Sequence, residues 1–336
     1  YNISIGGVYK VNDKLTIGLG YYNVFDYDVS WPYITILKNS TNSSVQPFNV
    51  SQTFKLDAAA AAGSYSFGNF SLGISANVFF LNSVSEFYQS NPQWQNNIGL
   101  SGYQFKYNQD AVGFGLNFGL NFQMNSSTKI SFLVKQGTSF SLSGDAETNM
   151  FRDLDSADVK SEVKSDFDTP WLLGAGVLYD INDNWKINCD LTYSLWGSTN
   201  KDIYYNFENY KWNNHNLEAD TISGYNPFNE NLDFEDTFEA ALGVEYFNPS
   251  GVSLRAGYRF IATQNSSETF SYLFPNTNEH WITAGINFSY ENFVVDAGIA
   301  VVIGSETEID KGDNNYFAGA YKGRGYYPSI TINYKF

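Results

Sequence analysis

The stretch "FGLNFGLNF" (residues 114–122) alternates strictly between two kinds of side chain. Phe or Leu stands at every even position, and Gly or Asn stands at every odd position between them. A period of two is that of a β-strand, whose successive side chains point to opposite faces of the sheet. In a soluble sheet the apolar face would meet a protein core. In an outer-membrane barrel it would meet lipid, with the polar face toward a lumen.

The same alternation recurs along the chain up to its last residue. The end of the sequence, "SITINYKF" (residues 329–336), places Ile330, Ile332, Tyr334 and Phe336 on one parity. A terminal Phe on the apolar face is also what the barrel assembly machinery of Gram-negative outer membranes reads. Comparable alternation marks residues 15–21, 70–78, 185–195, 252–260 and 293–303.

The composition suits a surface that is half apolar and half wet. Aromatic residues make up 18% of the 336 residues and charged residues 16%, yet the mean hydropathy is −0.30. No run approaches the ~20 apolar residues of a membrane-spanning helix, so a helical membrane protein is excluded. The net charge of −16 argues against a nucleic-acid partner. It suits either a surface that meets lipopolysaccharide or simple solubility. Cys189 stands alone, so no disulfide framework exists.

Short turns and long polar connections follow one another in a regular order. The strands predicted between them are ~9–11 residues long, the span of a tilted transmembrane strand. This asymmetry predicts one outer-membrane β-barrel domain over residues 1–336, with periplasmic turns and extracellular loops. The short turns lie near Asn12, Gly68, Ser126, Asp183, Pro249 and Asn292, and the connections near 23–52, 82–110, 144–165, 197–232, 262–279 and 304–325.

The number of strands adds a constraint. Six hairpins give twelve strands, and the C-terminal strand makes thirteen. Bacterial single-chain barrels have even numbers of strands. The simplest inference is an all-β, antiparallel transmembrane barrel of about fourteen strands, whose first strand is missing from this chain. The alternative is a further strand hidden in one of the long loops.

One predicted strand breaks the alternation. In "TFKLDAAAAAGSYSFG" (residues 53–68), Phe54 and Leu56 share a parity that Tyr65 and Phe67 do not. A β-bulge within residues 59–63 would reconcile the two halves. The run of Ala there either leaves space in the lumen or packs tightly against an inner element.

Three longer stretches carry a resemblance to a known family. They are residues 9–32 ("YKVNDKLTIGLGYYNVFDYDVSWP"), 167–197 and 273–304 ("LFPNTNEHWITAGINFSYENFVVDAGIAVVIG"). In order and spacing the chain resembles the FadL family of outer-membrane transporters of long-chain fatty acids and other hydrophobic compounds. The resemblance implies a fourteen-stranded barrel with an N-terminal hatch in its lumen. It also implies an Asn-Pro-Ala motif that kinks a nearby strand and opens a side window. No hatch segment stands before Tyr1 in this sequence, which leaves the gating mechanism open.

The expected function is passive transport of hydrophobic molecules, either long-chain fatty acid-like or aromatic. Loop aromatics would capture the cargo, the lumen would bind it, and it would leave laterally or into the periplasm. Burying an alkyl chain yields about 0.8 kcal/mol per CH₂, which drives capture. The alternative role of such aromatics is loop packing or an interfacial girdle. The candidate capture residues are Tyr88, Trp94, Tyr103, Phe105, Phe270, Tyr272, Leu273 and Phe274.

Two inward-facing arginines could hold an anionic headgroup. Arg255 and Arg259 share one face of a predicted strand, and a guanidinium binds carboxylates well. The alternative is structural, because inward carboxylates at Glu239, Glu245 and Asp296 could pair with both arginines.

Other classes of protein are weighed against transport. Histidine occurs only at His215 and His280, without a nucleophile motif or a metal-ligand cluster, so no catalytic residue, metal or cofactor is predicted. The remaining alternatives are a non-transporting partner or shuttle barrel, bound to another outer-membrane protein of a surface secretion complex, and a general porin. The predicted surroundings are membrane lipid and lipopolysaccharide in the bacterial outer membrane.

Overall fold

A computed structural model describes residues 3–35, 47–90, 102–148, 159–212, 215–216, 228–271, 274–310 and 318–336. Nearly all of them form antiparallel β-strands in one sheet of eighteen strands, with a separate small hairpin, β18–β19. The only helix in these ranges is the 3₁₀ turn η1 (Trp196–Ser198). None of the described segments forms a helix that is both long and apolar enough to span a membrane.

The strands follow the chain in order. They are β1 (Ile5–Lys10), β2 (Leu15–Thr35), β3 (Pro47–Phe67), β4 (Phe70–Ser90), β5 (Gly102–Gln123), β6 (Thr128–Lys135), β7 (Ser139–Thr148), β8 (Val159–Asp168), β9 (Leu172–Asp180), β10 (Trp185–Ser194), β11 (Asp202–Trp212), β12 (His215–Asn216), β13 (Phe228–Asn231), β14 (Thr237–Asn248), β15 (Val252–Ile261), β16 (Glu279–Tyr290), β17 (Phe293–Gly304), β18 (Thr307–Ile309), β19 (Gly319–Tyr321) and β20 (Arg324–Tyr334).

Some consecutive strands are two parts of one longer strand with a short break, which we call a leg. Lys135 of β6 pairs with Leu172 of β9, and Ser139 of β7 pairs with Asp168 of β8. Both pairings have the same register, so β6 continues into β7 and β8 continues into β9. β10 likewise leads into β11, and β13 into β14, but here the register shifts by two residues between the Ser194–Thr237 and Asp202–Asn231 pairs. When these four joined pairs count as one leg each and the two-residue β12 is left out, the eighteen strands form thirteen legs. This confirms the thirteen strands predicted in the sequence.

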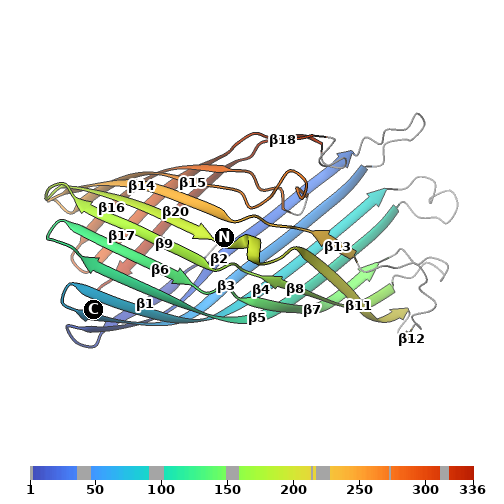
Figure 1. Cartoon of the computed structure of the whole chain (residues 1–336), viewed down its shortest axis with the longest axis horizontal. Helices are drawn as coiled ribbons and strands as arrows, with labels where there is room; N and C mark the ends of the chain where they lie inside the picture. Colours follow the sequence, from blue (N-terminus) through green and yellow to red (C-terminus); the bar gives the residue numbers. More distant parts are fainter. Residues whose placement is uncertain are drawn as a thin grey trace.

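The six predicted hairpin turns are all present. Figure 1 shows the legs running obliquely along an elongated body, with the short turns at one end and the longer connections at the other. Asn side chains close several of these turns. The Asn12 Oδ1 accepts hydrogen bonds from the backbone N–H groups of Lys14 and Leu15, both at 2.9 Å. Gly68 turns the β3–β4 hairpin with a φ of 68°, a conformation that glycine adopts without strain.

The sheet has two zones along its length, and its faces exchange character between them. In the lower zone, next to the short turns, apolar side chains point outward, as at Phe114 (71% exposed) and Phe118 (47%). In the upper zone the same strand points Tyr107 and Gln109 inward, with 2% and 0% exposure. Its outward residues there are polar and exposed: Gln104, Lys106, Asn108 and Asp110.

The strands are therefore longer than predicted. β2 to β5 run for 21 or 22 residues each, so much of 23–52 and 82–110 is strand rather than loop. The reason is that alternation continues beyond the lower zone with the opposite sense, as it does in a sheet with water outside and a core inside. The predicted length of ~9–11 residues describes only the lower part of each leg.

The bulge lies in β2 and not in β3. The register of β2 on β3 shifts between Asn23 and Phe25. The Asn23 amide clamps this point by donating to the Phe25 carbonyl at 3.1 Å and to the Asp57 Oδ1 at 3.0 Å. β3 keeps an unbroken register with β4 along its whole length. The bulge predicted within residues 59–63 is therefore wrong, because β3 places its apolar residues outward in one zone and inward in the other.

The two outermost strands of the main sheet are β1 and β20. Within the described ranges, β1 pairs with β2 alone, and β20 pairs with β17 alone. A fourteenth strand that joins β20 to β1 stays a prediction.

Candidate functional site

An aromatic cluster fills the interior of the upper zone. Phe54 lies at its centre with 5% exposure. Its ring stacks on Phe25 at a centroid distance of 5.7 Å and meets Phe167 edge-on at 4.7 Å and Phe274 edge-on at 6.2 Å. Such pairs stabilise the cluster beyond their buried area. The remaining buried members are Val50, Leu56, Leu81, Tyr107, Ala111, Phe140, Leu142, Ala146, Val163, Ile203, Tyr205, Leu232 and Phe234.

A buried polar network runs beside this cluster. The Tyr107 hydroxyl donates to the Tyr205 hydroxyl at 2.9 Å. The Gln109 amide donates to the Val163 carbonyl at 3.3 Å and accepts from the Ser165 hydroxyl at 3.1 Å. Burial raises the pKa of Tyr107 to about 12, so this phenol stays protonated at any physiological pH. The network satisfies polar groups that would otherwise destabilise an apolar interior.

The connection between β15 and β16 contributes aromatic residues to the same interior. Phe270 is 2% exposed and lies 4.4 Å from the Tyr321 ring, measured between centroids. Phe274 is 8% exposed and stacks on Tyr27 at 5.8 Å. The Asn265 amide donates to the carbonyl of Phe274, and this hydrogen bond links two parts of the same connection. Two of the predicted capture residues therefore lie inside the upper zone rather than on an exposed loop.

A carboxyl group is buried among these rings. Glu230 of β13 is 8% exposed, and its Oε1 accepts a hydrogen bond from the Ser271 hydroxyl at 2.7 Å. Its Oε2 and the Tyr27 hydroxyl have no hydrogen-bond partner among the described residues. Burial raises the pKa of Glu230 to about 7. Burial and the nearby charge of Glu230 both raise the pKa of Tyr27, which places these two groups near one another.

Glu230 makes the stability of the upper zone depend on pH. Its pKa rises on folding, so the folded protein holds a proton between about pH 4.5 and 7 that the unfolded chain releases. We therefore expect the free energy of unfolding to be highest below pH 4.5 and to fall by about 3 kcal/mol as the pH rises above 7. Urea unfolding of the detergent-solubilised protein at pH 4.5, 6 and 8 measures this. In Glu230→Gln the decrease should disappear, and an unchanged decrease would mean that other groups cause it.

The luminal arginines of the lower zone are paired with carboxylates. Arg255 forms ion pairs with Glu245 at 3.0 Å and with Asp296 at 2.8 Å. Arg259 pairs with Glu239 at 2.5 Å, and its guanidinium lies 5.7 Å from the centre of the Trp281 ring. These contacts match the structural alternative. Headgroup binding by Arg255 and Arg259 stays a prediction.

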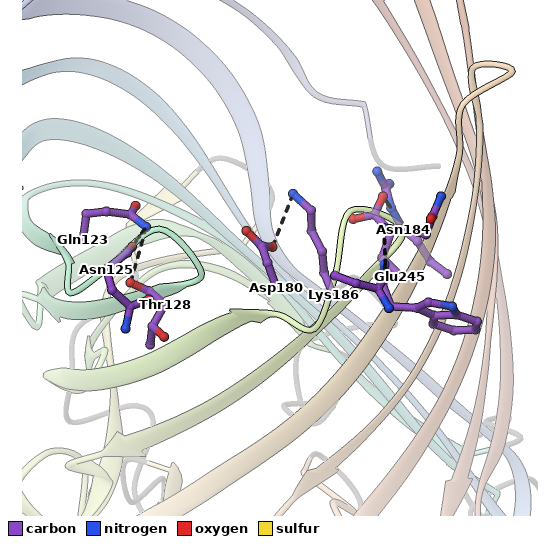
Figure 2. Close-up of polar contacts among 10 residues, drawn as sticks. Gln123, Asn125, Thr128, Asp180, Asn184, Lys186 and Glu245 are labelled. Carbon is purple, nitrogen blue, oxygen red and sulfur yellow. Dashed lines mark hydrogen bonds and ion pairs between the residues drawn. The ribbon is translucent and has the colours of Figure 1, made fainter.

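The charged side chains occupy one side of the lumen. Figure 2 shows Lys186 reaching toward Asp180 near the turn end, with 3.6 Å between the charged atoms. The Asn184 amide donates to the Phe247 carbonyl at 2.8 Å in the same region. The opposite side, formed by β1 to β5, carries mostly Gly, Ala, Ser and Asn at its luminal positions. An apolar molecule in the lumen would meet less bound water on that side.

A cavity of about 960 Å³ lies at the uncharged wall. Its lining includes outward-facing Leu19 and Tyr21 as well as luminal Gly20 and Ala60. The lining therefore includes residues of both faces of the sheet, and many of its luminal residues are Gly or Ala. Its volume is at the upper end of the range typical of ligand pockets. The other lining residues are Ile5, Gly6, Gly7, Ala59, Ala61, Ala76, Asn77, Val78, Phe114, Gly115, Leu116 and Gln136.

The other predicted capture residues are less closely gathered. Phe105 lies in β5, points inward and meets the Phe207 ring edge-on at 5.4 Å. Tyr88 is half-buried in β4. Tyr103 belongs to β5, whereas Trp94, Tyr272 and Leu273 lie outside the described residues. Their roles in binding stay predictions.

Sequence reasoning missed the residues at the centre of this interior, Tyr27, Phe54 and Glu230. For Tyr27 a signal existed, because Phe25, Tyr27, Val29 and Trp31 alternate with Asp26, Asp28 and Ser30. That pattern is typical of a strand with a wet outer face, and it is a better guide here than the polar composition that predicts a connection near residues 23–52.

The histidine that the structure describes fully lies away from this interior. The Tyr258 hydroxyl and the Ser305 hydroxyl contact the two ring nitrogens of His280 at 2.7 and 3.2 Å. Across the described ranges, no three His, Cys, Asp or Glu side chains come together closely enough to bind a metal ion.

The lower zone with its apolar exterior and the polar lumen define an outer-membrane β-barrel. Residues 3–336 match the model of the family described as outer membrane protein transport protein (OMPP1/FadL/TodX), and the chain belongs to this family. It is a family of bacterial outer-membrane transport proteins rather than of enzymes. No curated protein matches the sequence.

Solved structures share the fold at low sequence identity. A crystal structure of a Pseudomonas aeruginosa FadL homologue matches with a TM-score of 0.73 and 14% identity, over 98% of this chain and 77% of that one. The Pseudomonas putida toluene transporter TodX matches with a TM-score of 0.65 and 15% identity, over 99% and 81%. The CymD monoaromatic hydrocarbon channel matches at 0.65 and 16%, over 100% and 82%.

Proposed function

We propose that this barrel carries hydrophobic molecules passively across the outer membrane. Cargo binds in the aromatic interior of the upper zone and leaves through the wall of small residues that β1 to β5 form. Trp94, together with Tyr103 at the beginning of β5, makes the first contact with it. Family membership supports transport of hydrophobic compounds in general. Solved relatives described as toluene transporters and a monoaromatic hydrocarbon channel support aromatic cargo. Long-chain fatty acid-like cargo is the alternative, since a FadL homologue shares the fold as well.

The observation that carries this proposal is the cavity in the uncharged wall. A hydrophobic molecule gains little from crossing a charged aqueous lumen, since each buried CH₂ contributes about 0.8 kcal/mol that water contact would cancel. An exit through a wall of Gly and Ala keeps the cargo in apolar surroundings until it reaches lipid. The charged side of the lumen, with Arg255, Arg259 and their carboxylate partners, favours this route by holding water opposite the exit.

Narrowing the wall tests this route. Ala60→Phe places a ring in the cavity lining, and we expect the initial rate of toluene uptake to fall about tenfold because the ring fills the passage. Uptake of radiolabelled toluene and oleate is measured in intact Gram-negative cells that lack their own channels of this kind. Lipopolysaccharide then blocks direct diffusion through the outer leaflet.

The matched control is Ala297→Phe, which adds the same ring on the exposed outer face of β17. It should transport like the unmodified protein. Equal rates in both variants would refute the lateral exit and favour release into the periplasm. Cells with the unmodified protein that take up no more cargo than cells without it would refute transport altogether, and uptake of small polar solutes instead would favour a porin.

A further inference from the structure

Phe274 and Ser271 place a ring and a hydroxyl group in the upper interior, as a small aromatic ligand with a hydroxyl group would. The Phe274 ring stacks on Tyr27 at 5.8 Å and meets Phe54 and Phe234 edge-on at 6.2 and 5.9 Å. Three residues away, the Ser271 hydroxyl donates to Glu230 at 2.7 Å. The Phe274 backbone N–H in turn donates to the Ser271 oxygen at 3.3 Å, which fixes the ring and the hydroxyl relative to each other.

The polar groups around this arrangement have unused bonding capacity. Glu230 is 8% exposed, and its Oε2 accepts no hydrogen bond within the described part of the chain. The Tyr27 hydroxyl is also buried without a partner there. A buried polar atom without a hydrogen-bond partner destabilises the protein, so a ligand that supplies the missing partner gains free energy on binding. The other oxygen of Glu230 already accepts a hydrogen bond from a neutral hydroxyl group, that of Ser271. A hydroxyl group is therefore a suitable donor for the free oxygen as well.

We propose that Glu230 and Tyr27 are the polar handle of the cargo site, and that the site selects aromatic molecules bearing a hydroxyl group. The cargo ring takes the place of the Phe274 ring among Tyr27, Phe54 and Phe234. Its hydroxyl donates to Glu230 and accepts from Tyr27. This inference rests on the proposed transport function and names its substrate class.

The charges near the handle discriminate against other headgroups. Both Glu230 and Glu279 act electrostatically on Tyr27. Above pH 7, where Glu230 is ionised, a carboxylate placed there therefore meets charge of its own sign. The luminal cations Arg255 and Arg259 already have carboxylate partners in the lower zone. A hydrocarbon without a hydroxyl group packs among the aromatic rings but forms no hydrogen bond with Glu230 or Tyr27.

Three ligands on one skeleton test the handle in the purified full-length barrel. They are 4-pentylphenol, pentylbenzene and 4-pentylbenzoate, with dissociation constants measured by ligand-observed NMR and corrected with empty micelles. We expect 4-pentylphenol to bind about tenfold more tightly than either of the others, the ratio that one buried hydrogen bond to a carboxyl group provides. Tyr27→Phe keeps the stacked ring, and Glu230→Leu removes the carboxyl. Each should reduce the preference for the phenol without weakening binding of pentylbenzene.

The control is Tyr258→Phe, which removes an exposed phenol hydroxyl that contacts His280 away from the upper interior and should leave the ligand preference unchanged. Equal affinity for 4-pentylphenol and pentylbenzene in the unmodified protein would overturn the handle and leave hydrophobic transport standing. Tighter binding of the benzoate would overturn it in favour of a fatty acid-like cargo. Failure to bind any of the three would overturn the handle together with the proposed function.

Discussion

Phe118→Asp should prevent the barrel from inserting into a membrane. Phe118 lies in the lower zone of β5 with 47% of its side chain exposed on the outward face. The most costly charges at the bilayer midplane destabilise a barrel by about 2–4 kcal/mol, and loss of the lipid-facing ring adds to this. Folding into liposomes, followed by the shift of the unboiled band on an electrophoresis gel, measures insertion. We expect little or no folded band.

Asn117→Asp provides the comparison at the same depth. Asn117 faces the lumen and pairs with Lys135 across the β5–β6 ladder, so a carboxylate there meets water and a cation. This variant should insert as well as the unmodified protein. Equal tolerance at positions 117 and 118 would contradict the assignment of the two faces.

A second large effect is expected in the upper zone, where the faces exchange. Leu142 of β7 points into the aromatic interior with 3% exposure. An ionised carboxylate buried there lacks a partner, and Leu142→Asp should destabilise the upper zone by at least about 3 kcal/mol. Insertion should survive, because the lower zone is unchanged. Digestion of intact cells with proteinase K, which reaches only the outer surface, should cut this variant within β7 or β8.

The neighbouring position on the outer face supplies the control. Ser143 is exposed and lies opposite Lys164 of β8. Ser143→Asp should resist proteinase K as the unmodified protein does. Identical protease resistance of both variants would show that the upper interior is not a packed core.

Much of the barrel could be predicted from the sequence, for a physical reason. In the lower zone every leg has lipid on one side and a wet lumen on the other. Each strand therefore repeats the same alternation of apolar and polar residues, and the turn residues mark where one strand ends and the next begins. Asn12, Gly68 and the other turn residues therefore marked all six hairpins, and the thirteen legs followed. The candidate site was less predictable, because the polar exterior of residues 104–110 is typical of a loop as well as of a wet strand.

By itself, the sequence determined that this chain forms an antiparallel barrel with an apolar exterior, since alternation with a period of two is a local property of each strand. Only the tertiary structure decided where that alternation changes sense and what the upper interior contains. Glu230 accepts a hydrogen bond from Ser271 and lies near Tyr27, and these three residues are far apart in the chain. Their meeting depends on the register of β13 on β11 and on the path of the β15–β16 connection, and no local pattern encodes either.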